Sequence, residues 1–145
     1  MIERHFERIQ GYTGPLPQRS TQYAAGYDIA ASLSTIIEPG DIKLVRTGIK
    51  VKLGQYEYLE LISRSSLARN KHLVLPNGVG IIDSDYYGNP QNDGEIMAQL
   101  WNISDVPEVV NAGERIMQGI FHSYMIADND VANGVRVGGF GSTGV

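Results

Sequence analysis

Short runs of apolar residues recur along the chain, and turn-forming residues separate them. Tyr56–Ile62 alternates large apolar with charged residues over the length of a strand. Ile42–Leu53 mixes β-branched and polar residues around Gly48, which predicts a bent or bulged strand. Further short apolar runs occupy Leu73–Leu75, Val79–Ile82, Ile96–Trp101 and Ile116–Tyr124.

The connections between these runs are rich in Gly, Pro, Asn and Asp, as at Pro76–Gly78 and Asn89–Gly94. Many short strands at roughly even spacing predict an antiparallel sandwich or barrel. Only Ser65–Asn70 has a helical pattern, and it is short. The sequence therefore predicts one all-β domain with a short helix.

Composition narrows the choice of ligand. The chain has 145 residues, of which 42% are hydrophobic and 19% charged, as expected for one ordinary folded domain. Its net charge of −4 disfavours duplex DNA or RNA as a direct partner, whereas a small anionic ligand needs only a few local cations. The absence of cysteine excludes disulfides and thiolate metal sites. The N-terminus lacks an apolar segment, and no stretch has the length of a membrane span, so we expect a cytoplasmic protein.

The last ten residues, 136–145, form a glycine-rich segment suited to wrapping closely around a ligand. Arg136 could neutralise phosphate, Phe140 could stack on a base, and the Ser142 and Thr143 hydroxyls could bind phosphate oxygens. Residues 139–144 match the dinucleotide fingerprint G-x-G-x-x-G, but only Val145 follows, so the required helix is missing. A disordered tail is the simpler alternative.

Two internal segments carry candidate chemistry. In Ser63–Ala68, Ser65 and Ser66 occupy helix-capping positions, or they form an anion site together with Arg64. In Asn77–Gly88, an apolar run between glycine-bearing turns suggests a hairpin whose backbone reads a base edge. Asp83 follows this run directly, either as a turn cap or as a general base for water beside a polyphosphate.

Two further segments, Gly113–Gln118 and Ala25–Ala30, are read most simply as a strand start and a structural turn. Arg115 and Gln118 have opposite parity along a strand, so they would face the same side only if the chain bends between them.

Taken in order, AGYDIA, SRSSLA, NGVGIIDSDYYG, GERIMQ and RVGGFGSTG resemble the five motifs of the trimeric all-β deoxyuridine triphosphatase (dUTPase) family. The resemblance implies a jelly-roll-like β domain over residues 1–135 and a flexible arm, residues 136–145, that closes over a neighbouring subunit's active site. It also implies a homotrimer and Mg²⁺-dependent hydrolysis of dUTP to dUMP and pyrophosphate.

The resemblance also implies roles for individual residues. Asp83 is similar to the catalytic base, Tyr86 to the residue that excludes a 2′-hydroxyl, and Asp28 to the acid that holds metal-bound water. The uracil is read by Asn77 and by the backbone of Gly80, Ile81 and Ile82. Further substrate contacts are expected from Arg64, Ser65, Ser66, Met97, Gln118, Arg136, Phe140, Gly141, Ser142 and Thr143.

Two departures from the family pattern stand out. Arg136 lies one residue closer to Phe140 than usual, with Val135 in the usual Arg position. The turn Tyr87–Glu95 is longer than in compact members, which admits a phage-type member. This loop is either a plain surface insertion or a docking surface for a regulatory protein partner.

Two rival functions remain. In the related dCTP deaminases, which also contain Arg-Ser-Ser-Leu-Ala-Arg, catalysis needs a carboxylate where this chain has Gln99. A catalytically inactive nucleotide sensor is the second rival. The acid at Asp83 and the complete arm disfavour it.

Overall fold

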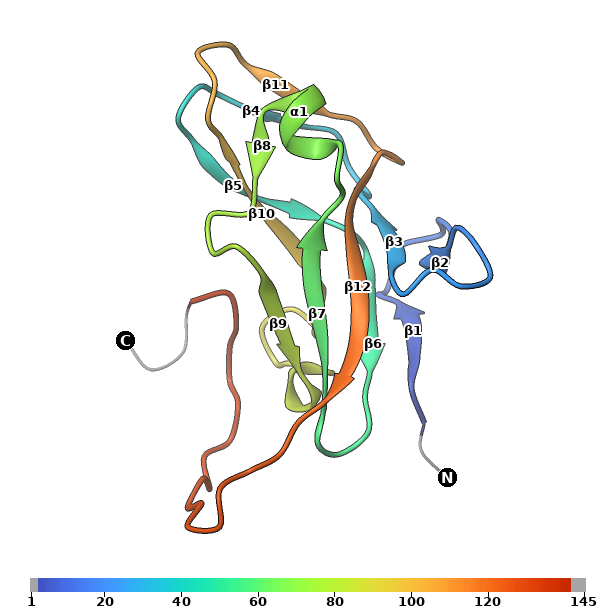
Figure 1. Ribbon diagram of the computed structural model, residues 1–145, viewed down its shortest axis with the longest axis vertical. Helices are drawn as coiled ribbons and strands as arrows, with labels where there is room; N and C mark the ends of the chain where they lie inside the picture. The colour runs from blue at the N-terminus through green and yellow to red at the C-terminus, as the bar shows by residue number, and fades with distance from the viewer. Residues whose placement is uncertain (1–2, 142–145) are drawn as a thin grey trace.

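The computed structural model describes residues 3–141, and within them almost all regular structure is β (Figure 1). Over those residues, the helical elements are one α-helix, α1 (Leu67–Lys71), and one 3₁₀ turn, η1 (Ser84–Tyr86). The predicted all-β domain with a short helix is confirmed. The strands are β1 (His5–Arg8), β2 (Gln18–Arg19), β3 (Tyr27–Ala30), β4 (Thr35–Ile37), β5 (Ile42–Arg46), β6 (Ile49–Lys52), β7 (Glu57–Ser63), β8 (Leu73–Val74), β9 (Gly80–Asp83), β10 (Met97–Asn102), β11 (Glu108–Val110) and β12 (Arg115–Ser123).

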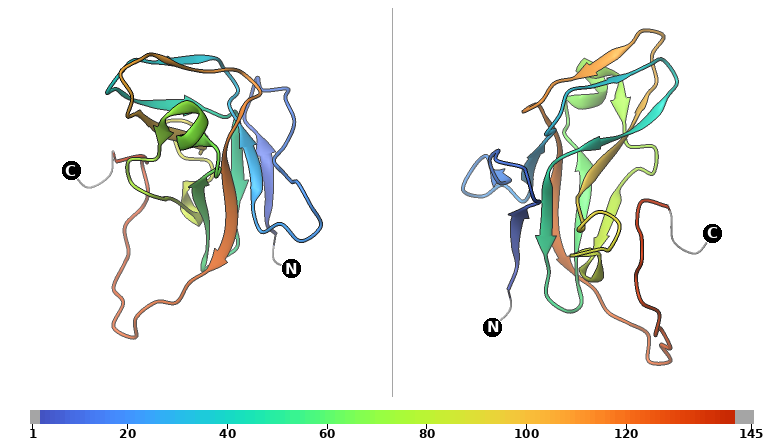
Figure 2. Two further views of the ribbon diagram at one scale, coloured as in Figure 1. Left: turned by 45° about the horizontal axis from the view of Figure 1, so that its top comes forward. Right: turned by 180° about the vertical axis from the view of Figure 1, so that it is seen from behind.

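The strands form antiparallel sheets that pack around a common core (Figures 1 and 2). The largest sheet has five strands in the order β2-β3-β12-β7-β9. A three-stranded sheet, β5-β10-β8, and the pairs β1-β6 and β4-β11 complete the domain. Leu59 and Leu61 of β7 are buried in one cluster with Ala98 and Leu100 of β10. This arrangement agrees with the predicted jelly-roll-like fold.

The apolar segment Ile42–Leu53 is not the single bent strand that its pattern suggests. It divides into β5, which pairs with β10, and β6, which pairs with β1. Gly48 lies between them with a φ of 72°, and a Cβ there would come within 2.5 Å of Tyr12 Cγ. The left-handed backbone and this close contact both require glycine, so the chain breaks here and passes from one sheet to another.

Several short strands were not predicted from the sequence pattern. β1, β2, β3, β4 and β11 each have at most four residues, which is too short for alternation to stand out. The helix predicted at Ser65–Asn70 forms slightly later, at Leu67–Lys71, and ends at His72 in the left-handed conformation with a φ of 54°.

The chain leaves the large sheet after β12 and forms no further regular element up to residue 141. Figures 1 and 2 show this segment extending beyond the end of β12 and then turning back to run alongside β9. The arm therefore returns to the edge of the sheet where the candidate hairpin lies.

Candidate active site

The strand β9 lies at the edge of the large sheet, with β7 as its neighbour. The register places Gly80 opposite Leu61 and Asp83 opposite Tyr58. An edge strand leaves backbone N–H and C=O groups without partners in the sheet, and such groups can read the edge of a base. Ile82 is buried in the core, whereas Ile81 on the opposite face is exposed.

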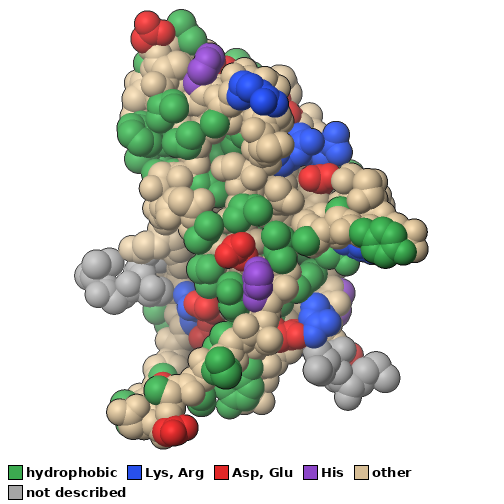
Figure 3. Space-filling view, viewed as in Figure 1, with side chains coloured by type: hydrophobic (Ala, Val, Ile, Leu, Met, Phe, Trp, Pro, Cys, Tyr) green, Lys and Arg blue, Asp and Glu red, His purple; other side chains and the backbone are tan. Residues whose placement is uncertain are grey.

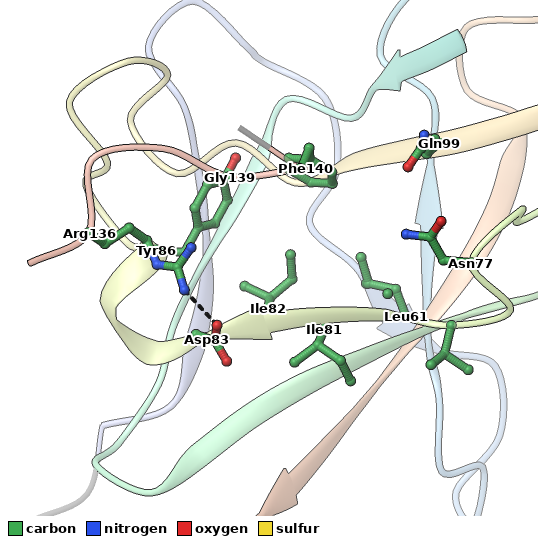
Figure 4. A pocket seen from close by; sticks show the side chains of 13 residues that line it. Leu61, Asn77, Ile81, Ile82, Asp83, Tyr86, Gln99, Arg136, Gly139 and Phe140 are labelled. Carbon is green, nitrogen blue, oxygen red and sulfur yellow. Dashed lines mark hydrogen bonds and ion pairs between the residues drawn. The ribbon is translucent and has the colours of Figure 1, made fainter. Parts of the chain in front are cut away.

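A cavity of about 450 Å³ lies between β9, η1 and the returning arm (Figure 4). Its volume falls in the range typical of small-molecule sites. Most of the predicted base, sugar and catalytic residues meet here. The lining residues are Leu61, Asn77, Val79, Gly80, Ile81, Ile82, Asp83, Tyr86, Gln99, Arg136, Gly139, Phe140 and Gly141.

Asp83 stands at the rim of this cavity, with about half of its side chain exposed. Arg136 of the arm donates to its Oδ2 over 2.6 Å and to Asp85 Oδ1 over 2.7 Å. The hydrogen bond to Asp85 is the chief cause that raises the pKa of Arg136 above its ordinary value. The arm is thus fixed to the acidic turn by one guanidinium between two carboxylates.

Tyr86 forms a wall of the cavity and is 3% exposed. Phe140 meets its ring edge to face, with the centroids 5.7 Å apart. Gly139 lies so close to the ring that a Cβ there would approach Tyr86 Cε1 to 2.7 Å. Burial raises the pKa of the Tyr86 phenol to about 12. The ring is therefore a neutral, closely packed surface at any physiological pH.

A second cluster lies on β3 and β12. Asp28 Oδ1 is 3.6 Å from Arg64 Nε, and its Oδ2 accepts a hydrogen bond from Arg115 over 3.3 Å. Gln118 pairs with Asp28 across the strands. The register shifts between Arg115 and Met117, as a bend in the chain would produce, and Arg115 donates to the acid that is the register partner of Gln118.

Ser65 and Ser66 follow this cluster at the end of β7. Ser66 is the N-cap residue of α1, but its side chain makes no capping hydrogen bond. Capping therefore does not account for the serine. The anion-site interpretation of Arg64, Ser65 and Ser66 stays a prediction.

The two clusters are far apart within one chain. On β7, Asp83 aligns with Tyr58, whereas Gln118 and Asp28 align with Ile62. Asp83 and Asp28 are therefore offset by four residues along the strand direction, and they lie three strands apart in the order β3-β12-β7-β9. With ordinary β-sheet spacings, their Cα atoms are about 20 Å apart. Water attack at one phosphorus cannot use both clusters of the same chain.

Other predicted site residues have less direct support. Met97 lines a smaller adjoining cavity, which it shares with Asn77, Gly80 and Phe140. Ser142 and Thr143 lie outside the described residues. Over residues 3–141, no group of three or more His, Asp or Glu could hold a metal ion, and no helix could cross a membrane.

Sequence reasoning named Gln99 only as the counterpart of the deaminase carboxylate, and it did not predict Leu61, Val79 or Gly139 as cavity residues. The side chains of Gln99 and Asn77 point toward the same end of the cavity (Figure 4). The parity of β10 could have revealed Gln99, because it shares a face of that strand with the predicted contact Met97.

Asp28 nevertheless fits one mode of magnesium binding. Mg²⁺ usually keeps several waters and is held by one or two carboxylates together with substrate phosphates. A single acid among two arginines and a glutamine suits an ion that arrives on a polyphosphate, and does not suit a cage made by protein alone. The fold and both clusters thus define an all-β nucleotide hydrolase.

Comparisons with known proteins identify the family. A family model described as dUTPase matches residues 13–144. A Lactococcus lactis protein named deoxyuridine 5'-triphosphate nucleotidohydrolase is 44% identical, with 97% of each chain aligned. A protein of the same name from Desulfitobacterium hafniense is 41% identical over 90% of this chain and 87% of its own. The chain therefore belongs to the dUTPase family.

Solved structures agree with this assignment. The dUTPase from Streptococcus mutans is 47% identical, with a TM-score of 0.84 over 86% of this chain and 99% of that chain. The dUTPase of Staphylococcus bacteriophage 80alpha has the same fold, with a TM-score of 0.74 at 18% identity over 92% of this chain and 98% of its own. A mutant dUTPase from phage phi11 of S. aureus, 18% identical with a TM-score of 0.73 over 91% of this chain and 97% of its own, coordinates a structural Mg(II) ion.

Proposed function

We propose that the protein hydrolyses dUTP to dUMP and pyrophosphate. The observation that carries this proposal is Asp83 at the rim of a base-sized cavity, in a chain of the dUTPase family. Asp83 accepts a proton from water while the water oxygen forms a bond to the α-phosphorus. The bond from that phosphorus to the oxygen bridging to the β-phosphorus breaks, and pyrophosphate leaves.

The cavity supplies recognition of the nucleoside. The edge backbone of β9 from Gly80 to Ile82, together with Asn77, reads the uracil, and the narrow hairpin leaves no room for a 5-methyl group. The buried Tyr86 ring lies under the deoxyribose and excludes a 2′-hydroxyl. Phe140 of the arm stacks on the base, which suits its position over the cavity (Figure 4).

Phosphate handling belongs to the second cluster and to the arm. Arg64, Ser65, Ser66 and Gln118 contact the phosphates near the reacting bond. Arg136, with Ser142 and Thr143, contacts the distal phosphates. To do so, the Arg136 guanidinium leaves the Asp83 carboxylate and binds phosphate in its place. A Mg²⁺ ion held by the triphosphate, with Asp28 on its water, would neutralise charge that develops on the phosphates.

We also propose a homotrimer in which each site is shared between chains. The separation of about 20 Å between Asp83 and Asp28 supports this, because a site with both residues must draw them from two chains. Exposed apolar residues Val79, Ile81 and Tyr56 lie on the large sheet and its hairpins, and hydrophobic side chains gather over that face (Figure 3). Such a face suits contact with further copies.

The arm is proposed to serve a neighbouring chain's site. Within the single described chain it contacts its own β9 hairpin, so the exchange between chains stays a prediction. Two inactive variants test it: Asp83→Asn, and a chain truncated after Asn133. Refolded together, they regain activity if base and arm come from different chains. If both belong to one chain, no mixture regains activity, even when native mass spectrometry confirms mixed trimers.

Pyrophosphate release from dUTP, dCTP, dTTP and UTP tests the proposed reaction itself. We expect rapid release from dUTP and little from the other three. Ammonia release from dCTP would support the deaminase alternative. Gln99 disfavours that alternative, because an amide cannot shuttle protons as a carboxylate does. Tight dUTP binding without any product would support the sensor alternative.

Location and partners complete the proposal. We place the protein in the cytoplasm, with no direct nucleic-acid partner. Nothing in the comparisons supports a regulatory protein partner for loop 87–95. The inward contacts of Asn89 and Glu95, which are 2% and 4% exposed, favour a role within the chain over a docking surface.

A further inference from the structure

Loop 87–95 is tied to the wall of the base and sugar cavity by its own hydrogen bonds. The Tyr86 hydroxyl donates to the Glu95 carbonyl oxygen over 2.6 Å and accepts from Asn92 Nδ2 over 2.9 Å. Both contacts come from the far end of the loop, in a turn that is longer than in compact family members. The loop therefore returns to hold the side chain that precedes it.

The orientation of the Asn92 side chain is fixed by the rest of the loop. Its Oδ1 accepts from Asn89 Nδ2 and from the Gly94 N–H, both over 3.1 Å. With two donors at the oxygen, the amide nitrogen has to face Tyr86. The phenol proton then has to go to the Glu95 carbonyl oxygen.

The loop itself is firmly held against the domain. Glu95 is buried, forms an ion pair with Arg46 over 3.0 Å and accepts a hydrogen bond from the Gly48 N–H over 2.9 Å. Asp93 pairs with Lys50 over 2.8 Å. Gly94 has a φ of 82°, and a Cβ there would approach Tyr86 O to 2.5 Å, so the turn is compact against the residue it holds. Asn92 is thus presented from a rigid support.

A ring can exclude a 2′-hydroxyl by steric contact only if it cannot move aside when the larger sugar binds. We infer that Asn92 is a positioning residue that sharpens selection of the 2′-deoxy sugar, because it fixes the Tyr86 ring through its hydroxyl. This inference rests on the proposed function, in which Tyr86 meets the deoxyribose. On this inference, the longer loop contributes to the choice between deoxyribose and ribose substrates.

The test compares kcat/KM for dUTP and UTP in Asn92→Ala and in a matched control, Gln91→Ala, which changes an exposed neighbour in the same loop. Loss of one hydrogen bond should lower the dUTP to UTP ratio about fivefold. The Gln91 variant should keep the wild-type ratio. If Asn92→Ala lowers both values equally, Asn92 only supports the fold of the loop and the inference is wrong.

A double-mutant cycle separates the direct contact from general loosening. In a Tyr86→Phe background the hydroxyl is absent, so Asn92→Ala should change the ratio no further. A further drop of the same size would contradict the inference. If Asn92→Ala does not fold, Tyr86→Phe alone removes the same hydrogen bond from the side of the ring, and a drop in the ratio at least as large is expected.

Binding measured by calorimetry with dUMP and UMP gives a readout that needs no turnover. The preference for dUMP should fall in Asn92→Ala by a similar factor, and an unchanged preference would contradict the inference. A wild-type protein that releases no pyrophosphate from dUTP would overturn the proposed function. Normal dUTP hydrolysis with unchanged selectivity in Asn92→Ala would overturn the inference alone.

Discussion

The hairpin cavity and the Asp28 cluster are built by different physical means. In the cavity, selectivity comes from packing: the Tyr86 ring is buried, and Phe140 and Gly139 close against it. At the other end of the sheet, Asp28 lies between two arginines on a more open surface, where the Arg115 side chain is 54% exposed. One region provides shape, and the other provides charge.

This difference indicates which property each region controls. Steric contact separates nucleosides that differ by one hydroxyl or one methyl group, whereas arginines bind any triphosphate regardless of its base. Substitutions in the cavity should therefore change the ratio between substrates. Substitutions in the Asp28 cluster should weaken all substrates alike.

The largest effect is expected at the acid that joins the two regions in the proposed reaction. Asp83→Asn should lower kcat for dUTP by about 10²–10⁴-fold, the usual range for loss of a general base, while binding stays near normal. Stopped-flow pyrophosphate release and calorimetry with dUMP would measure the two quantities. Asp85→Asn is the matched control, because it removes a charge from the same turn and leaves the acid at the cavity rim. A tenth of wild-type turnover in Asp83→Asn would rule out the role.

The second-largest loss of activity is expected from removal of an arginine that contacts the substrate phosphates. Arg64→Ala should lower kcat/KM for dUTP about 10- to 100-fold, as expected for a lost charge-assisted hydrogen bond. The ratio of dUTP to UTP should not change. Arg69→Ala, an exposed arginine of α1, provides the control. A changed ratio in Arg64→Ala would mean that charge and shape are not separated between the two regions.

Loss of the packed ring should affect selectivity more than rate. Tyr86→Ala should raise relative activity on UTP more than on dTTP, because Tyr86 faces the sugar and the β9 backbone faces the uracil 5-position. The change corresponds to at most about 3 kcal/mol, the range of a steric filter. Measurement of kcat/KM for dUTP, UTP and dTTP checks it, and equal effects on UTP and dTTP would contradict two separate filters.

The smallest expected effect is that of pH on selectivity. Burial raises the pKa of Tyr86 to about 12, so the phenol stays protonated where an ordinary tyrosine, with a pKa of 10.0, would be half ionised. The dUTP to UTP ratio should therefore stay constant from about pH 7 to the ordinary tyrosine value of 10.0, even if kcat itself changes. A ratio that falls with a midpoint near the ordinary value would show that the hydroxyl is not buried as described.

The hairpin half of the site could be predicted from sequence because its residues are close neighbours in the chain. Asn77, Asp83 and Tyr86 lie within one motif, and local turn chemistry largely decides their arrangement. The hydrogen bond from Asn92 to Tyr86 depends on how the loop folds back in space, which no local pattern encodes. The division of Ile42–Leu53 into two strands likewise depends on the approach of Tyr12 to Gly48.

The central claim is that the acid and the phosphate cluster of one site come from two chains, and mixing of Asp83→Asn with Arg64→Ala tests it most directly. Asp83→Asn alone should be nearly inactive, and Arg64→Ala alone should keep about a tenth of wild-type kcat/KM or less. After refolding at equal amounts, random trimers should contain both intact groups in about a quarter of their sites if the groups come from different chains. Recovery toward that fraction of wild-type activity is the predicted result. Activity that stays at the level of the separate variants, with mixed trimers confirmed by native mass spectrometry, would contradict the shared site.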